Sequence, residues 1–486
     1  RRGMTTPFWT DLNVRRALGL PLDQAVEGAG YTGVSTDSRS IREGELFVAL
    51  SGERFDGHDH VAEALAQGAA GAVVSRPPQS GRAGRLYVVH DTLKALGALA
   101  EFRRRARPVR VVAITGSSGK TTTKELVRAA LGSRFRVHAT EGNLNNRIGL
   151  PLTILGAPLD SEVLVLELGT SEPGEIATLT RIATPDVGVI TTVGDAHLEG
   201  LGSREGVLRE KLALAAEMSQ AGRLVVGDEP PELAERVRAL GRDVLVAGPS
   251  DRADAALRPG APAPDALGRF AFGWEGERIQ LGIPGLHGVR NALLALGVAR
   301  LFDIPAAEAA RGVETVSPTG MRGEIRRVGG LTLILDCYNA NPQSVEAALD
   351  LLTLVPGGGG RVAILGSMLE LGEGSAELHR KTLRSALGRA LDVVVATGEF
   401  DRIHRNGPAD AGAGADAETD DAAEVDAGPL PRPALIRAPA LADAYAALRD
   451  RLRGDETILL KGSRGAAVEA LLPLFERDFA GDGGGD

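Results

Sequence analysis

The sequence predicts an α/β protein with three domains: a small mixed α/β N-terminal domain, a central parallel sheet of the P-loop type covered by helices, and a C-terminal Rossmann-like doubly wound domain. Three observations support this fold class. A chain of 486 residues has room for about three domains. Two separate stretches alternate short apolar runs with helical patterns, as parallel sheets wrapped by helices do. A glycine-rich loop follows the first apolar run of the first stretch.

The composition excludes several classes of protein. Hydrophobic residues make up 43% of the chain and charged residues 24%, which is typical of globular proteins. The net charge of -9 argues against a general nucleic-acid binder, although seven of the carboxylates lie between Pro408 and Pro431. The single cysteine, Cys337, excludes an internal disulfide and a cysteine-built zinc site, and it suits a reducing cytoplasm. No apolar run is long enough to cross a bilayer, and Met4 is a candidate initiator. We therefore expect a cytoplasmic protein.

The predicted N-terminal domain covers residues 1–107. It carries short strand signals, such as residues 45–50, and an alanine-rich helix at residues 61–67. An arginine-rich helix then leads to Pro108, after which a new apolar strand begins. We therefore place a domain boundary at residue 108.

The predicted central domain covers residues 108–316, and the predicted C-terminal domain covers residues 317–486. Each has its own series of apolar runs separated by helical stretches, which favours one parallel sheet per domain. The expected strands are residues 111–114, 163–166, 187–193 and 224–226 in the central domain, and 331–335, 362–365, 393–396 and 458–460 in the C-terminal domain. Residues 408–431 contain almost no large apolar side chains, so we expect an acidic flexible loop there.

The most informative stretch is residues 111–122, in which an apolar strand runs into a glycine loop, then Lys120 and Thr121, then a helix. In such a loop the backbone amides converge on phosphate oxygens, the lysine adds a mobile charge, and the threonine can hold magnesium. The loop is shorter than the common eight-residue pattern, because Ile114 stands five places before Gly119. The pattern indicates a nucleotide phosphate site, and a glycine turn that binds nothing is the alternative.

Two further polar side chains follow apolar strands of the central domain. Glu167 comes directly after residues 163–166, and His197 follows residues 187–193. Ligands collect at the carboxyl ends of parallel strands, and magnesium on ATP prefers a few carboxylate and hydroxyl oxygens. We interpret Glu167 and His197 as candidate metal ligands. The alternatives are a glutamate that faces water and a histidine with a structural role.

Lys211 falls in the apolar stripe of a helix that Ser203 can cap, at helical spacing from Val207, Leu214 and Met218. Two interpretations are open. In the first, the lysine stem packs on the apolar stripe and its ammonium reaches water. Alternatively, burial lowers the pKa of the amine, and the neutral amine reacts with carbon dioxide to give a carbamate that binds metal.

Taken in order along the chain, these residues resemble the Mur ligases, a family of ATP-dependent amide ligases of peptidoglycan synthesis. The resemblance spans all three predicted domains. The resemblance rests on the sequence motifs at residues 37–39, 52–58, 115–125, 142–146, 167–169, 196–199, Asn291, 336–342, 369–372, 378–380 and 461–465.

The resemblance implies a role for each candidate residue. The residues implied to bind ATP are Thr115, Gly116, Ser117, Ser118, Gly119, Lys120, Thr121, Thr122, Asn291, Arg322 and Asp336. Of these, Asn291 would contact adenine, Arg322 the phosphates and Asp336 the ribose. The implied ligands of two magnesium ions are Thr121 with Glu167, and His197 with carbamylated Lys211. Lys120, Glu167, His197 and Lys211 are the implied catalytic residues.

The N-terminal domain would hold the uridine end of the substrate through Asp37, Ser38 and Arg39, while Asn143 and Asn146 would lie near the incoming substrate. Within the family, the chain is most similar to the member that joins D-alanyl-D-alanine to UDP-N-acetylmuramoyl-tripeptide through an acyl phosphate. Its product is a precursor for the cell wall, and thus for cell shape and division. Because an acyl phosphate would hydrolyse in open water, we also expect the C-terminal domain to close over the central domain before reaction. We expect a monomer with no nucleic-acid partner and no membrane span.

Three other functions are alternatives. Within the same fold, the chain could be the Mur ligase that adds the third amino acid, or a folylpolyglutamate synthase. The phrases at residues 37–39 and 336–342 favour the D-alanyl-D-alanine ligase. From another class, it could be a nucleotide-binding regulator that has lost catalysis. The retained Glu167, His197 and Lys211 argue against that loss.

Overall fold

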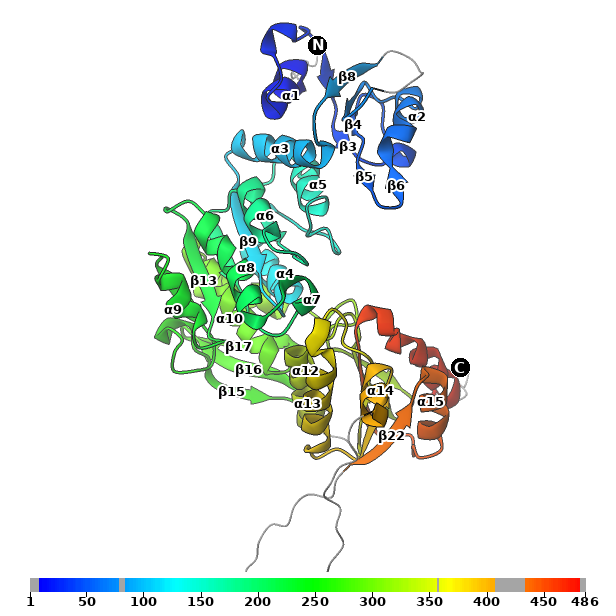
Figure 1. Ribbon diagram of the computed structural model, residues 1–486. Coiled ribbons are helices and arrows are strands. Elements are labelled where there is room, and N and C mark those ends of the chain that lie inside the picture. The colour runs from blue at the N-terminus through cyan, green and yellow to red at the C-terminus, as the bar shows by residue number, and fades with distance from the viewer. Residues whose placement is uncertain (1–7, 78–83, 356–357, 407–432, 481–486) are drawn as a thin grey trace, which may run out of the picture.

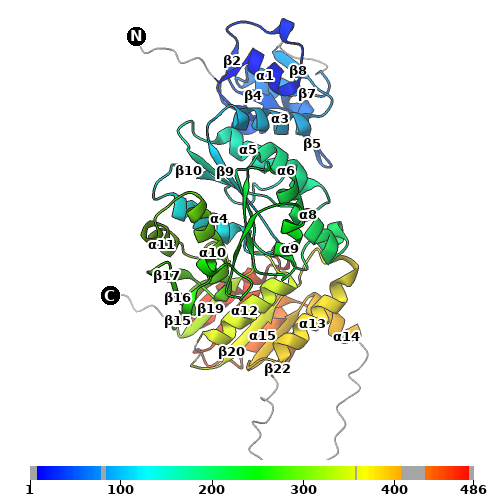
Figure 2. The same ribbon diagram turned by 90° about the vertical axis from the view of Figure 1, so that its left-hand side faces the viewer.

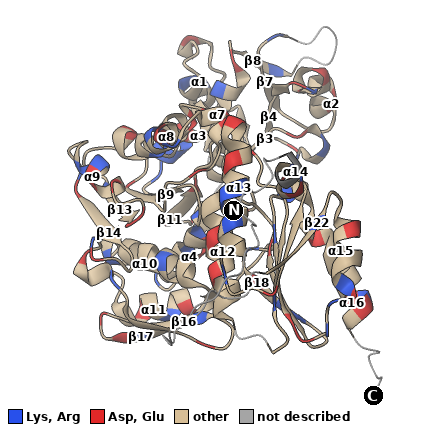
Figure 3. Ribbon diagram, turned by 60° about the horizontal axis from the view of Figure 1, so that its bottom comes forward, with Lys and Arg blue, Asp and Glu red and all other residues tan. Residues whose placement is uncertain are grey.

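The computed structural model describes residues 8–77, 84–355, 358–406 and 433–480. Figures 1 and 2 show three lobes in a row, with the N-terminal lobe at one end and the C-terminal lobe at the other. Acidic and basic residues are interspersed over these lobes (Figure 3). The acidic segment at 408–431 and Met4 lie outside the described residues.

The N-terminal lobe is built on a small parallel sheet with the strand order β3-β4-β7-β8. Its helices and strands are β1 (Trp9–Thr10), α1 (Asp11–Leu18), β2 (Gly30–Tyr31), β3 (Val34–Ser35), β4 (Leu46–Val48), β5 (Ser51–Gly52), β6 (Phe55–Asp56), α2 (Val61–Ala66), β7 (Gly71–Val74), β8 (Arg85–Val88) and α3 (Thr92–Arg105). The predicted helix at residues 61–67 is confirmed as α2. The small paired strands β1-β2 and β5-β6 add the mixed character that the sequence predicted.

The arginine-rich helix α3 joins this lobe to the central one. The Arg103 guanidinium donates to the backbone oxygen of Ala157 at 3.1 Å. That of Arg104 donates to the backbone oxygen of Ala183 at 3.2 Å and to the Asp186 carboxylate at 3.0 Å. Because both arginines are buried, these hydrogen bonds offset part of the cost of burying their charge, while Arg103 Nε has no hydrogen-bond partner among the described residues.

The central lobe holds a parallel sheet with the strand order β10-β11-β9-β12-β13-β14. Its elements are β9 (Arg110–Thr115), α4 (Lys120–Leu131), β10 (Val137–Ala139), α5 (Gly149–Gly156), β11 (Val163–Glu167), α6 (Glu175–Ala183), β12 (Val187–Ile190), α7 (Leu198–Leu201), α8 (Arg204–Glu217), β13 (Arg223–Gly227), α9 (Leu233–Arg238), β14 (Val244–Ala247), β15 (Gly260–Pro264), β16 (Arg269–Trp274), β17 (Glu277–Pro284), α10 (Leu286–Leu301) and α11 (Ala306–Glu314). One face of this sheet packs on α4, α10 and α11, and the other on α5, α6 and α8.

The C-terminal lobe holds a second sheet, with the strand order β18-β19-β23-β20-β21-β22. Its elements are β18 (Glu324–Val328), β19 (Leu331–Asp336), α12 (Pro342–Leu354), β20 (Arg361–Leu365), α13 (Ser375–Leu387), β21 (Val393–Thr397), α14 (Glu399–Asn406), β22 (Ala434–Ala438), α15 (Leu441–Arg449), β23 (Thr457–Lys461) and α16 (Leu472–Phe479). The edge strand β18 is antiparallel and the other pairs are parallel. Apolar cores cover both faces of the sheet, as expected for a doubly wound domain.

All the strands expected in these two lobes are present, so the predicted α/β fold class is confirmed. The antiparallel sheet β15-β16-β17 and the edge strands β10, β14, β18 and β22 were not predicted. Among the residues described here, no helix combines the length and the apolar character that crossing a bilayer requires.

Candidate functional site

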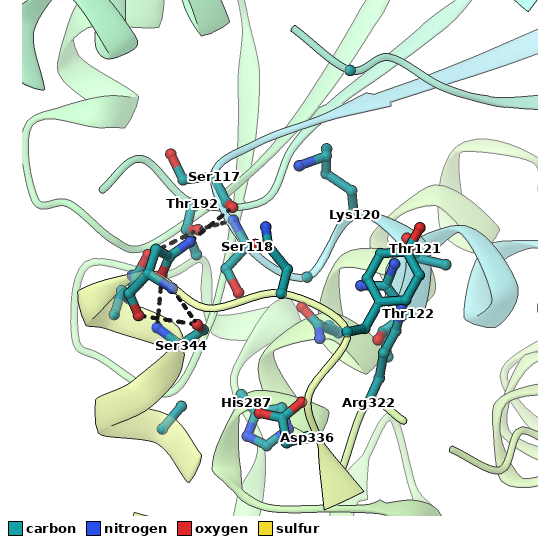
Figure 4. A pocket seen from close by; sticks show the side chains of 18 of the residues that line it. Ser117, Ser118, Lys120, Thr121, Thr122, Thr192, His287, Arg322, Asp336 and Ser344 are labelled. Atoms are coloured by element: carbon teal, nitrogen blue, oxygen red, sulfur yellow. Dashed lines mark hydrogen bonds between the residues drawn. The ribbon is translucent and has the colours of Figure 1, made fainter. Parts of the chain in front are cut away.

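A cavity of about 670 Å³ opens between the central and C-terminal lobes. The central lobe contributes the glycine loop and the carboxyl edge of its sheet, and the C-terminal lobe contributes the carboxyl end of β19 and the start of α12. Figure 4 shows these two sets of side chains facing each other. Predicted site residues that line it are Ser117, Ser118, Gly119, Lys120, Thr121, Thr122, Asn143, Asn146, Glu167, His197, Asn291, Arg322 and Asp336.

The glycine loop between β9 and α4 has the shape of a phosphate cradle. Gly119 has a φ of +80° and immediately precedes α4, so the loop amides and the helix N-terminus point into the same space. The segment after β12 holds the loop in place: the Ser117 N–H donates to the Thr192 carbonyl at 2.8 Å, and the Thr191 hydroxyl donates to the Ser118 carbonyl at 2.5 Å. The loop is therefore preformed by contacts with its neighbour in the sheet.

Replacing Gly116 by alanine should distort this loop. Gly116 has a φ of +148°, and an added Cβ would lie 1.9 Å from the Thr191 hydroxyl oxygen. We expect Gly116→Ala to lower the free energy of unfolding by about 1–3 kcal/mol and to weaken ATP binding. Thermal denaturation and calorimetric titration with ATP measure these two effects. Gly156→Ala is the control, since a Cβ at Gly156 meets open space. Equal ATP affinity in the two variants would contradict the prediction.

Glu167 and Thr121 lie together at the base of the loop. The Thr121 hydroxyl donates to Glu167 Oε2 at 2.9 Å, and the Asn145 amide donates to Glu167 Oε1 at 2.9 Å. Glu167 is buried, so the alternative in which it faces water is wrong. Sequence reasoning missed Asn145, although the phrase at 142–146 contained it. The sequence could not tell which asparagine of that phrase reaches the strand end.

Lys120 is half-buried, and its Nζ donates to the Gly116 carbonyl at 2.9 Å. Burial lowers the pKa of its ammonium, while the nearby Glu167 carboxylate acts in the opposite direction. The lysine thus folds back over its own loop, within reach of any anion held by the loop amides.

Lys211 lies on α8, which Ser203 caps as predicted. Its side chain is 0% exposed, so the interpretation in which the ammonium reaches water is wrong. Among the described residues, its Nζ has no hydrogen-bond partner. Burial, and then the like charge of Lys120, hold the pKa of this amine well below its usual value. A neutral amine is the form that a reaction with carbon dioxide requires.

His197 stands just before α7, in a left-handed backbone conformation with a φ of +56°. Its Nδ1 lies 2.5 Å from Oε2 of Glu370, which comes from the C-terminal lobe. Hydrogen bonding to this imidazole lowers the pKa of the Glu370 carboxyl. His197 lines the cavity, so the two lobes meet at one of the candidate metal ligands.

The three residues assigned to the nucleoside and phosphates also line the cavity. Asn291 packs against the loop, since a Cβ at Gly119 would lie 2.5 Å from Asn291 Oδ1. The Arg322 guanidinium stacks 3.8 Å from the centre of the Tyr338 ring. In Figure 4, Asp336 and His287 lie side by side below the loop.

Asp336 is held by a buried lysine that the sequence analysis did not select. Lys461 Nζ donates to Asp336 Oδ2 at 2.8 Å and to the Asn339 carbonyl at 2.7 Å. Asp336 and Lys461 are register partners at the carboxyl ends of β19 and β23. The signal available in the sequence was the position of Lys461 at the end of an apolar run.

Other candidate residues lie outside the cavity or have different partners. The Thr115 hydroxyl donates to the Leu168 carbonyl at 3.0 Å within the sheet. Asn146 lines the cavity but accepts from the Ile148 and Gly149 N–H groups, so its amide oxygen is used at the start of α5. Asp37, Ser38 and Arg39 lie in the N-terminal lobe, away from the cavity lining, where Arg39 pairs with Asp37 at 2.8 Å.

The residues fit a magnesium site that is completed by a substrate phosphate. Within the described ranges, no three His, Cys, Asp or Glu side chains cluster as a ready-made metal centre. Magnesium bound to a nucleotide needs fewer protein ligands, because phosphate and water oxygens supply the rest. The paired oxygens of Thr121 and Glu167 and the orphaned amine of Lys211 match this kind of site.

Three family descriptions match the chain: "Mur ligase family, catalytic domain" at residues 30–117, "Mur ligase middle domain" at residues 114–299, and "Mur ligase, glutamate ligase domain" at residues 321–464. The chain is 39% identical to the UDP-N-acetylmuramoyl-tripeptide–D-alanyl-D-alanine ligase of Bacillus subtilis over 355 residues, which is 72% of this chain and 76% of the relative.

Two solved structures extend the similarity over all three lobes. The MurF crystal structure from Acinetobacter baumannii has a TM-score of 0.83 and 28% identity, covering 96% of this chain and 99% of that chain. The MurF ligase of Thermotoga maritima, solved in complex with ADP, has a TM-score of 0.78 and 28% identity, covering 92% of this chain and 97% of that chain.

Proposed function

The chain belongs to the Mur ligase family, and we propose that it is the ATP-dependent ligase that joins D-alanyl-D-alanine to UDP-N-acetylmuramoyl-tripeptide. The products are ADP, phosphate and the UDP-linked pentapeptide precursor of peptidoglycan. One observation carries the proposal. The cavity between two lobes gathers a phosphate loop, Glu167 and His197, and the buried amine of Lys211 interacts electrostatically with Lys120 and Glu167.

The chemistry requires ATP because a carboxylate does not accept an amine at neutral pH, since its leaving group would be oxide. Transfer of the terminal phosphoryl group to the tripeptide carboxylate gives an acyl phosphate, whose leaving group is phosphate. In this proposal the loop amides and Lys120 hold the ATP phosphates and stabilise the charge that spreads during transfer. The amine of D-alanyl-D-alanine then attacks the acyl carbon, and phosphate leaves.

The candidate ligands suggest two metal positions. Thr121 and Glu167 would hold the first magnesium ion, and His197 with Lys211 the second. When bound, magnesium would neutralise charge on the transferring phosphoryl group and orient its oxygens. Lys211 would act as a carbamate: its neutral nitrogen bonds to the carbon of carbon dioxide and loses a proton, which converts the amine into an anionic ligand. The unpartnered Nζ supports this assignment. The free amine is a buried polar group without a hydrogen-bond partner among the described residues, whereas a carbamate at the same position would bind the magnesium ion.

The remaining assignments concern substrate binding. Asn291 would contact adenine, Asp336 the ribose and Arg322 the phosphates. Lys461 supports the assignment of Asp336, because the buried ion pair keeps the carboxylate oriented toward the cavity. The uridine end would bind near Asp37, Ser38 and Arg39 in the N-terminal lobe. Asn143, which lines the cavity, would lie near the incoming substrate.

An acyl phosphate hydrolyses in open water, so we propose that the C-terminal lobe closes over the central lobe before transfer. Contacts between the lobes already surround the phosphate loop: the Asn341 amide donates to the Ser117 carbonyl at 3.4 Å, and the Thr192 hydroxyl donates to Gln343 at 3.3 Å. We further propose a monomer that acts in the cytoplasm.

A phosphate-release assay tests the function and its alternatives together. Release from ATP should require both UDP-N-acetylmuramoyl-tripeptide and D-alanyl-D-alanine. A ligase for the third residue would instead require a UDP-dipeptide, a folylpolyglutamate synthase would require a folate, and a regulator would release none. Tripeptides ending in lysine and in diaminopimelate should be compared, since the third residue is a separate question. Release without the dipeptide substrate at the full rate would contradict the proposal.

A further inference from the structure

The central and C-terminal lobes meet at the short helix α7, and the contact includes a pair of side chains and a backbone hydrogen bond. His197, which precedes α7, pairs with Glu370 at 2.5 Å. In addition, the backbone N–H of Glu199 donates to the backbone carbonyl of Glu370 at 3.1 Å. Figure 1 shows α7 at the border between these lobes. The loop that carries Glu370 is thus fixed to the start of α7 through both backbone and side chain.

The backbone on both sides is shaped for this contact. His197 and Glu370 both adopt positive φ values, +56° and +62°, which residues other than glycine rarely do. Gly372 packs so closely on α7 that an added Cβ would lie 3.1 Å from the Cα of Glu199. Unusual backbone conformations on both sides of one contact indicate that the contact has a function rather than being incidental.

The geometry of the pair determines which imidazole nitrogen is available. Glu370 faces Nδ1, so this nitrogen carries the proton and donates it to the carboxylate. In the neutral imidazole, the other nitrogen, Nε2, then keeps its lone pair. In metal sites a carboxylate commonly fixes a histidine ligand in this way, and it raises the basicity of the ligating nitrogen.

We propose that Glu370 is a positioning residue that orients His197 for metal, and that it thereby makes metal affinity depend on docking of the C-terminal lobe. The proposal rests on the proposed function, which assigns His197 as a metal ligand. Because Glu370 belongs to the other lobe, His197 is fully oriented only when the lobes are in contact. By linkage, metal bound at His197 must favour the docked arrangement by the same factor by which docking raises metal affinity.

Binding of Mn²⁺ measures the first part without using turnover. The full chain, with a non-hydrolysable ATP analogue bound, is titrated with Mn²⁺, and free metal is followed by electron paramagnetic resonance. Glu370→Ala should weaken binding of the second equivalent by about 10- to 100-fold, the usual effect of losing a carboxylate behind a histidine ligand. Glu370→Gln should lie between it and the wild type, because an amide oxygen still accepts from Nδ1. Mn²⁺ affinity in Glu370→Ala equal to that of the wild type would overturn the proposal.

Two controls separate this proposal from the proposed function. Glu373→Gln changes an exposed carboxylate three positions along the same loop and should bind Mn²⁺ as the wild type does. His197→Ala should weaken binding at least as much as Glu370→Ala. Unchanged affinity in His197→Ala would show that the metal assignment of His197 is wrong. Weakened affinity in His197→Ala with unchanged affinity in Glu370→Ala would overturn only the role of Glu370.

Small-angle scattering tests the link to docking. With the ATP analogue bound, Mn²⁺ should reduce the radius of gyration of the wild type, and this response should be smaller in Glu370→Ala. A wild-type radius that does not respond to Mn²⁺, or an equal response in the two proteins, would overturn the coupling.

Discussion

Replacing Lys211 by alanine or by arginine should abolish turnover, with a loss of at least about 10³-fold in kcat, or about 4 kcal/mol. The amine is buried and has no partner among the described residues. We therefore attribute its importance to the carbamate that it forms rather than to a structural contact. Arginine keeps a positive charge and cannot form the carbamate. In Lys211→Ala, formate or acetate should partly restore phosphate release, because either can place a carboxylate in the vacated space. Phosphate release in the presence of both substrates measures these effects.

Loss of folding can be separated from loss of chemistry at this position. Lys211→Met has a similar volume and removes the buried nitrogen, so its free energy of unfolding should equal or exceed that of the wild type while its turnover stays lost. Arg209→Ala, on the exposed side of the same helix, is the control and should keep full activity. Wild-type turnover in Lys211→Ala without added carboxylate would eliminate the carbamate.

Replacing Lys120 by methionine should lower kcat/KM for ATP by about 10²- to 10³-fold, because it removes the mobile positive charge at the phosphate loop. The side chain lies over the loop, with Nζ on the Gly116 carbonyl, and methionine can fill the same space without the charge. Steady-state phosphate release at varied ATP measures the effect. Binding of UDP-N-acetylmuramoyl-tripeptide, measured by calorimetry, should stay unchanged, since we assign the uridine end to the N-terminal lobe.

The exposed Lys381 on α13 provides a matched control for this charge change. Lys381→Met removes the same charge from the C-terminal lobe and should leave kcat/KM for ATP at the wild-type value. A similar loss in both variants would indicate a general electrostatic effect. An unchanged kcat/KM in Lys120→Met would contradict the assignment of the loop.

Much of the fold could be predicted because its strands are buried on both faces. Residues 163–166 form a continuous apolar run, and residues 331–335 are apolar except for Thr332. In the structure they are the buried strands β11 and β19. The antiparallel sheet β15-β16-β17 was harder to predict. β16 is alternately buried and half-buried, and this weaker pattern was not separated from the strong parallel series around it.

The pattern of the sequence alone indicated residues on the phosphate loop and at strand ends, because these positions follow directly from the local sequence. The resemblance to the Mur ligases added residues such as Asn291 and Arg322. Asn145 and Lys461 were missed because their importance comes from partners far along the chain, Glu167 and Asp336. The state of Lys211 could not be read from helical spacing either. Whether a lysine reaches water depends on every element packed around it, and only the structure shows that this one is 0% exposed.

In the proposed reaction, ATP converts the tripeptide carboxylate into an acyl phosphate before the dipeptide attacks. The most direct test uses UDP-N-acetylmuramoyl-tripeptide labelled with ¹⁸O in that carboxylate, together with ATP and D-alanyl-D-alanine. Mass spectrometry of the released phosphate should show one ¹⁸O atom for each pentapeptide formed, because the amine breaks the bond between the acyl carbon and the labelled oxygen. Unlabelled phosphate released alongside pentapeptide would contradict the account.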